Sequence, residues 1–227
     1  MIQQNARKIK PMTLVETGFD IIYLGTVLIS GILLCINAGT GSERWLFGIM
    51  ALILAAGDSF HLIPRIYALW GSGTEAHTAV LGIGKLVASV TMTIFYVFLW
   101  HIGLIHYPDS SPAFMTAVIY TLAVIRIALC LFPQNRWTSK DPPQVWAIWR
   151  NVPFYMLGML VMLLFAEGSQ IDRDGFSFLW VAILVSFACY LPVVLFSGRS
   201  RKVGMLMLPK SCAYAAIVLM GFSLAGL

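Results

Sequence analysis

The sequence predicts an all-α integral membrane protein with seven transmembrane helices, a cytoplasmic N-terminus and an extracytoplasmic C-terminus. Hydrophobic residues make up 59% of the chain and charged residues only 11%, against about 25% charged residues in a soluble domain. The apolar residues form seven segments, each near the roughly 20 residues that cross a bilayer as a helix. Positive charge recurs in alternate connecting segments, as seven crossings require.

The predicted spans follow one another with short joints. They lie near residues 14–37, 45–70, 78–105, 113–133, 148–166, 176–196 and 204–226. The joints are polar or rich in Gly and Pro, for example AGTGSE and QNRWTSKDPPQ. We therefore predict a single polytopic domain over 1–227. A six-span alternative is less favoured, because all seven segments are comparably long and uninterrupted.

The loop charges predict the orientation. Basic residues dominate the segment before span one and the loops after spans four and six: Arg7, Lys8, Lys10, Arg136, Lys140, Arg199, Arg201 and Lys202. Positive loops stay in the cytoplasm, which places the N-terminus inside and the C-terminus outside, in the plasma (inner) membrane. The net charge of +5 is therefore explained by orientation, and we expect membrane lipids but no nucleic acid as partners.

Spans one and two carry the densest polar patterns. Glu16 and Asp20 lie four residues apart, so they share one helix face. The segment GDSFHLIPR at 57–65 places Asp58, His61 and Arg65 at i, i+3 and i+7, again on one face. A carboxylate and an imidazole one turn apart can act as a general base and its orienting partner. We predict that Asp58 and His61 are the catalytic residues if the protein is an enzyme.

The later spans contribute single basic residues. Lys85 lies early in span three, Arg126 late in span four, and Lys210 early in span seven, four residues before Tyr214. With the predicted orientation, all of these residues and those of spans one and two fall in the cytoplasmic half of the membrane. A charge in the bilayer costs about 2.5–3.5 kcal/mol or more and usually faces the bundle interior, so the cluster predicts a polar pocket open to the cytoplasm.

Basic residues outnumber acidic ones in this cluster, which predicts an anionic ligand, either a small molecule or a lipid headgroup. The predicted ligand-binding residues are Glu16, Asp20, Arg65, Lys85, Arg126, Lys210 and Tyr214. A structural alternative is that Asp58 with Arg126, or Asp20 with Lys85, form salt bridges that only fix helix register. The sequence leaves the cofactor and the oligomeric state open.

A metal site is not predicted. Ser59 and His61 in span two of a seven-span chain are loosely similar to the hemolysin III and progestin/adipoQ receptor group. The zinc-binding pattern of that group also has a His-x-x-x-His near span seven, whereas span seven here reads LPKSCAYAAIVLMGF. The four cysteines lie inside spans and form no C-x-x-C pair, so we expect them to be packing residues.

Three classes of function are compatible with these patterns. The leading hypothesis is a protein with a cytoplasm-facing pocket for an anionic ligand, such as a membrane-embedded lipid-modifying enzyme. The first alternative is a small-solute transporter, which would bind near mid-membrane and expose the site alternately. The second is a sensor or partner-binding protein that binds a signal without turnover.

Overall fold

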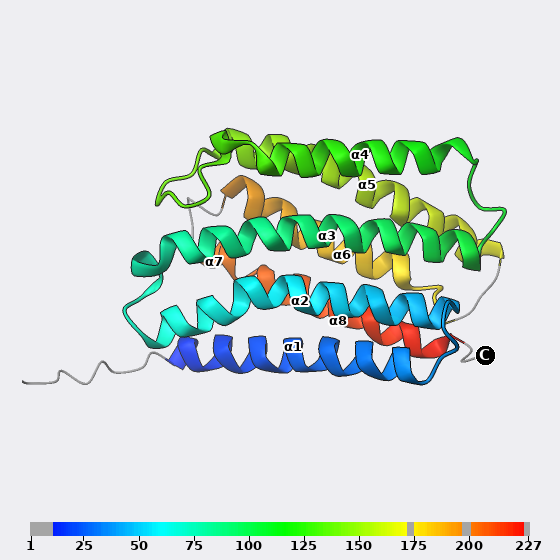
Figure 1. Cartoon of the computed structure of the whole chain (residues 1–227), viewed down its shortest axis with the longest axis horizontal. Coiled ribbons are helices and arrows are strands. Elements are labelled where there is room, and N and C mark those ends of the chain that lie inside the picture. The colour runs from blue at the N-terminus through cyan, green and yellow to red at the C-terminus, as the bar shows by residue number, and fades with distance from the viewer. Residues whose placement is uncertain (1–10, 172–174, 197–200, 225–227) are drawn as a thin grey trace, which may run out of the picture.

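The computed structural model describes residues 11–171, 175–196 and 201–224, and these residues form helices and turns without a strand. Figure 1 shows the helices running roughly along the long axis of the molecule. The long helices are α1 (Pro11–Ile36), α2 (Glu43–Trp70), α3 (Thr78–His106), α4 (Phe114–Leu131), α5 (Gln144–Ile171), α6 (Leu179–Phe196) and α8 (Met207–Met220). A four-residue α7 (Arg201–Gly204) and the 3-10 turns Thr74–His77, Pro133–Asn135 and Gly221–Ser223 complete the described chain.

Six helices, α1 to α6, are long and apolar enough to cross a membrane. The predicted all-helical, polytopic character is thereby supported, with bounds close to the predicted spans. The seventh apolar helix, Met207–Ser223, is shorter. At 1.5 Å per residue it measures about 25 Å, slightly less than the roughly 30 Å of a hydrocarbon core.

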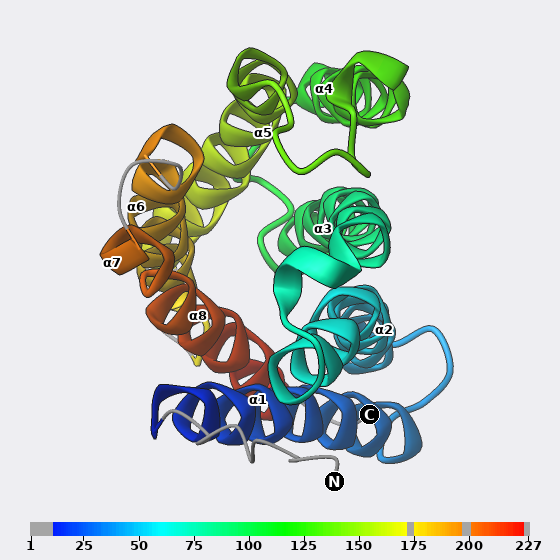
Figure 2. The ribbon, with the colours of Figure 1, turned by 90° about the vertical axis from the view of Figure 1, so that its left-hand side faces the viewer.

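The helices form a closed ring. Viewed from one end, α1, α2, α3, α4, α5, α6 and α8 follow one another, and α1 meets α8 to close the ring (Figure 2). Consecutive helices run in opposite directions, so α1, α3, α5 and α8 begin at one end of the bundle (Figure 1, left). We call this the lysine end, after Lys85 and Lys210, and the opposite end the Glu43 end.

The distribution of apolar side chains fits a lipid environment. Large hydrophobic residues are exposed on the outside of the ring, including Ile22, Phe60 and Phe178, which are 59–70% exposed. Soluble monomers rarely expose contiguous apolar surface of this extent. Inside the ring the Glu43 half is filled by fully buried apolar side chains such as Phe47 and Phe165. The bundle therefore presents hydrocarbon to its surroundings and keeps its polar side chains within.

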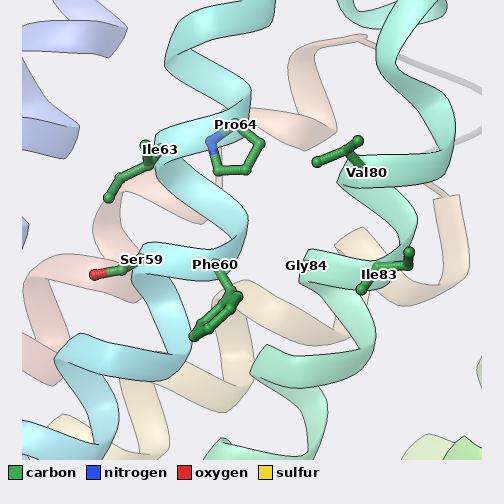
Figure 3. Close-up of a pocket in the computed structure, with 7 residues that line it drawn as sticks. All are labelled: Ser59, Phe60, Ile63, Pro64, Val80, Ile83 and Gly84. Atoms are coloured by element: carbon green, nitrogen blue, oxygen red, sulfur yellow. The ribbon is translucent and has the colours of Figure 1, made fainter.

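Helices α2 and α3 approach closely beside Pro64, which removes the amide hydrogen that would bond the carbonyl of Phe60. That carbonyl lies against Gly84 of α3, and a Cβ at position 84 would lie 2.2 Å from the oxygen. Figure 3 shows Phe60, Pro64 and Gly84 together at this contact. Glycine at position 84 therefore allows the freed carbonyl to pack against α3, which fixes Lys85 next to the segment that carries His61.

Candidate functional site

On three helices, side-chain exposure falls from the lysine end of the ring towards its middle. On α3, Lys85, Ser89, Met92 and Tyr96 share one helix face. Lys85 is exposed, Ser89 is half-buried, Met92 is 6% exposed and Tyr96 is fully buried. Exposure along this face therefore falls steadily from the lysine end towards the middle of the bundle.

Helices α8 and α2 show the same gradient. Lys210 is half-buried, whereas Tyr214 is only 2% exposed and Ile217 is fully buried. On α2, His61 is half-buried, while Leu54, two turns further into the bundle, is 1% exposed. Side chains on three helices thus become more exposed towards the lysine end, and we call the region that Lys85, His61 and Lys210 share there the opening.

Aromatic side chains close this opening near the middle of the bundle. The hydroxyl oxygens of Tyr96 and Tyr214 lie 3.3 Å apart. The rings of Phe154 and Phe187 pack against that of Tyr96, with centroid distances of 5.3 Å and 5.5 Å. We call these four residues the aromatic plug, and it separates the polar lysine end from the apolar Glu43 half.

The predicted acidic residues meet on α1 and α2 but have different surroundings. Glu16 forms an ion pair with Arg65. Asp58 accepts a hydrogen bond of 2.6 Å from the hydroxyl of Tyr23. Asp20 is 6% exposed, and its Oδ2 has no hydrogen-bond partner among the described residues.

The two lysines form no ion pair with the described residues. Among residues 11–171, 175–196 and 201–224, no carboxylate lies within ion-pair distance of Lys85 or Lys210. The ammonium of Lys210 lies 4.9 Å from the ring centre of Tyr190 and 5.1 Å from that of Tyr214. Aromatic faces stabilise an ammonium through their quadrupole, but they carry no net charge. The positive charge of Lys210 is therefore supported without being neutralised.

Arg126 is bound entirely by its own protein surroundings. Its Nε donates to Thr93 Oγ1 at 2.9 Å, and one terminal nitrogen donates to the Arg150 carbonyl at 2.9 Å and to Asn151 Oδ1 at 3.0 Å. Its guanidinium also lies 3.7 Å from the ring centre of Phe154. Arg126 therefore links α4 to α3 and α5. Neither of the alternative salt bridges, Asp58 with Arg126 or Asp20 with Lys85, is formed.

The predicted catalytic pair is present at the opening without a direct bond between its members. Asp58 is held by Tyr23, while His61 Nδ1 is buried and has no described hydrogen-bond partner. An imidazole nitrogen without a partner can accept or donate a proton once a ligand supplies the other group. The structure thus adds Tyr23 as the residue that orients Asp58.

Three residues of this region were not predicted from the sequence: Tyr23, Thr93 and Tyr190. Tyr23 carries a weak signal, because it lies three residues after Asp20 and therefore on nearly the same helix face. Tyr190 holds the Asn151 side chain through a hydrogen bond of 3.2 Å and contacts Lys210. Nothing in the sequence pairs these positions, since each bond joins helices that are distant along the chain.

Within the described part of the chain, no three His, Cys, Asp or Glu side chains gather closely enough to hold a metal ion. Two apolar hollows lie on the outer surface of the ring. One lies between α2 and α3 and is lined by Ser59, Phe60, Ile63, Pro64, Val80, Ile83 and Gly84 (Figure 3). The other lies between α6 and α8 beside Pro209. Their apolar linings suit lipid chains and not an ionic ligand.

Comparison with known proteins gives no further guide, because no family model, curated protein or solved structure matches this chain.

Proposed function

We propose that this protein is an integral membrane protein that binds an anionic small molecule or lipid headgroup at the lysine end of its helix ring. The observation that carries the proposal is the pair of lysines that form no ion pair with the described residues. Lys85 on α3 and Lys210 on α8 come from facing sides of the ring (Figure 2), at the end towards which side-chain exposure rises. An anion between them would gain two charge-assisted contacts.

The orientation part of the proposal rests on loop charge. The lysine end carries the basic loop with Arg136 and Lys140, and positive loops favour the cytoplasm. The proposed site therefore faces the cytoplasm from the plasma (inner) membrane, and seven crossings place the C-terminus outside. The alternating helix directions of Figure 1 are consistent with this topology.

The chemistry proposed for the site assigns each predicted residue a role. Lys85 and Lys210 neutralise the anionic group, and the ring of Tyr214 supports Lys210. Asp58, oriented by Tyr23, and His61, with its unbonded Nδ1, supply a base and an acid for proton transfer.

The remaining basic and acidic residues surround the proposed site. Glu16 holds Arg65 at the rim of the opening. Arg126 fixes the spacing of α3, α4 and α5, because its hydrogen bonds are already taken by the protein. Asp20 adds a carboxyl group on α1, the helix next to α8 in the ring. The aromatic plug favours a ligand that enters and leaves on one side over a solute that passes through the ring.

The test is anion binding by the purified full-length protein in detergent micelles. We expect ethyl phosphate to raise the unfolding temperature of the parent and native mass spectrometry to detect a bound anionic molecule. The double variant Lys85→Met/Lys210→Met should lose both effects. Lys140→Met, which removes an exposed lysine at the same end of the bundle, is the matched control and should keep them.

Absence of both effects in the parent would overturn the proposal, as would an unchanged response in the double-lysine variant. Flux of the bound molecule through proteoliposomes would instead indicate the transporter, and would require the aromatic plug to open. Conversion of the bound molecule by the parent would separate an enzyme from a sensor.

A further inference from the structure

Charge at the lysine end is divided between two pairs of helices, and in the ring order α8, α1, α2, α3 the basic pair flanks the acidic pair. The carboxyl groups of Glu16, Asp20 and Asp58 lie on the adjacent helices α1 and α2. The ammonium groups of Lys85 and Lys210 lie on α3 and α8. We call these the acidic side and the basic side. An anion on the basic side explains the lysines but leaves the acidic side unexplained.

Asp20 on the acidic side has a buried oxygen that needs a donor. It is 6% exposed, and its Oδ2 has no partner among the described residues. Leaving a buried acceptor unsatisfied costs about 1–3 kcal/mol, and more when the group is charged. Asp20 therefore keeps a carboxyl oxygen unpaired at a buried position, where the missing hydrogen bond costs free energy.

Neighbouring donors are already engaged elsewhere. The Tyr23 hydroxyl donates to Asp58, the Arg65 guanidinium binds Glu16, and the Trp70 indole donates to the Thr17 hydroxyl at 3.0 Å. Asp20 also lies within electrostatic range of Glu16 and Asp58, which add negative potential, and of Arg65, whose positive charge is shared with Glu16. A cationic donor from outside the chain would form the missing hydrogen bond and offset the negative potential of the carboxyl groups.

The two sides adjoin one another. Lys210 is within electrostatic range of Asp58, yet the two form no ion pair. Arg126 is occupied by Thr93 and Asn151, so it does not offset the acidic side. The remaining basic groups, Arg65, Lys85 and Lys210, then equal the three carboxyl groups in number. A ligand that carries both charges would fill the opening without upsetting this balance.

We propose that the ligand is a zwitterion: an anionic phosphate or carboxylate group held by Lys85 and Lys210, joined through a short linker to a protonated amine that donates to Asp20 Oδ2. The inference deepens the proposed function and rests on it. Aminoalkyl phosphates, free or as a phospholipid headgroup, are the ligand class with this chemistry. A primary amine is required, because a quaternary ammonium has no N–H to donate.

The test compares three soluble probes that share a phosphate ester. Phosphoethanolamine carries a primary amine, phosphocholine a quaternary ammonium, and ethyl phosphate no cation. Dissociation constants are obtained from thermal-shift titrations of the full-length protein in micelles. We expect phosphoethanolamine to bind about tenfold or more tightly than either other probe, as one hydrogen bond between charged groups provides.

Variants test whether the higher affinity for phosphoethanolamine depends on the acidic side. Asp20→Asn keeps the size of the side chain and should lower phosphoethanolamine affinity to that of ethyl phosphate, while ethyl phosphate binding stays unchanged. Asp109→Asn removes an exposed carboxylate from the Glu43 end and should alter neither probe. If Asp20→Asn does not fold, the ranking of the three probes on the parent decides the question.

The outcomes separate the two proposals. Equal affinity for all three probes, still dependent on the lysines, overturns the zwitterion and leaves anion binding intact. Failure of ethyl phosphate to bind overturns the proposed function itself. Stabilisation by ethylammonium or sodium chloride that depends on Asp20 and not on the lysines also overturns the zwitterion, in favour of a simple cation site.

A last arm identifies the source of the zwitterion. The protein is placed in nanodiscs of phosphatidylcholine with or without phosphatidylethanolamine. If a lipid headgroup is the ligand, soluble phosphoethanolamine should lose about tenfold in apparent affinity in the phosphatidylethanolamine nanodiscs through competition. If the ligand is a free metabolite, the two nanodiscs should give the same affinity.

Discussion

Substitution of Gly84 by alanine tests how the site is positioned. The added Cβ would lie 2.2 Å from the Phe60 carbonyl oxygen and 2.9 Å from the His61 Cα. A relaxed C···O contact is about 3.3 Å, so α2 and α3 must separate by about 1 Å. Overpacking of this kind costs about 1–3 kcal/mol, and the contact involves backbone atoms, which cannot rotate away.

Gly25→Ala is the matched control, because a Cβ at that position on α1 meets nothing within 4 Å. Both substitutions gain roughly 0.5–1 kcal/mol from the helix preference of alanine over glycine. This gain cancels when the two variants are compared. The free energy of unfolding of Gly84→Ala should therefore be about 1–3 kcal/mol below that of Gly25→Ala.

Unfolding in mixed micelles by titration with sodium dodecyl sulfate provides the measurement. Ethyl phosphate affinity should also fall in Gly84→Ala, since Lys85 moves with α3 relative to His61. Equal stability of the two alanine variants would refute the close packing of α2 on α3. Lower stability with unchanged affinity would separate this packing from the binding site.

Three further outcomes are expected. A phosphatase fused after Leu227 should be active and one fused after Arg201 should be inactive, because loop charge places the lysine end inside. The reverse pattern would contradict the seven-span topology. Arg126→Leu should lower the free energy of unfolding by about 2–4 kcal/mol, because hydrogen bonds to a buried charge are lost. The same sodium dodecyl sulfate titration measures this loss, and the folded variant should keep its affinity for ethyl phosphate. Asp58→Asn and His61→Phe should each bind ligand but fail to convert it when product is followed by mass spectrometry; conversion by a variant carrying both would exclude them as catalytic residues.

Much of the fold could be predicted from the sequence, because membrane insertion depends on local properties. Each apolar segment of about 20 residues satisfies its own backbone hydrogen bonds as a helix, so composition and length are enough to find α1 to α6. The Gly- and Pro-rich joints locate their ends within a few residues. The seventh segment is the exception, since its helix, Met207–Ser223, is shorter than its apolar stretch implied.

Helical periodicity also predicted which polar residues share a face within one helix. It grouped Glu16 with Asp20 and Asp58 with His61, because a face depends only on spacing along the chain. Lys85 and Lys210 were predicted to face the bundle interior because a charge in the bilayer is costly, whereas Lys85 is exposed and Lys210 is half-buried.

Only the tertiary structure decided which charges meet. Arg126 was grouped with the lysines by sequence, but Thr93 and Asn151 on neighbouring helices bind it. Asp58 is bonded to Tyr23 and not to the histidine one turn away, and Asp20 is left with an unbonded oxygen. These differences depend on the rotation of each helix about its axis and on its neighbours in the ring. Both follow from packing between segments far apart in the chain, which local spacing does not encode.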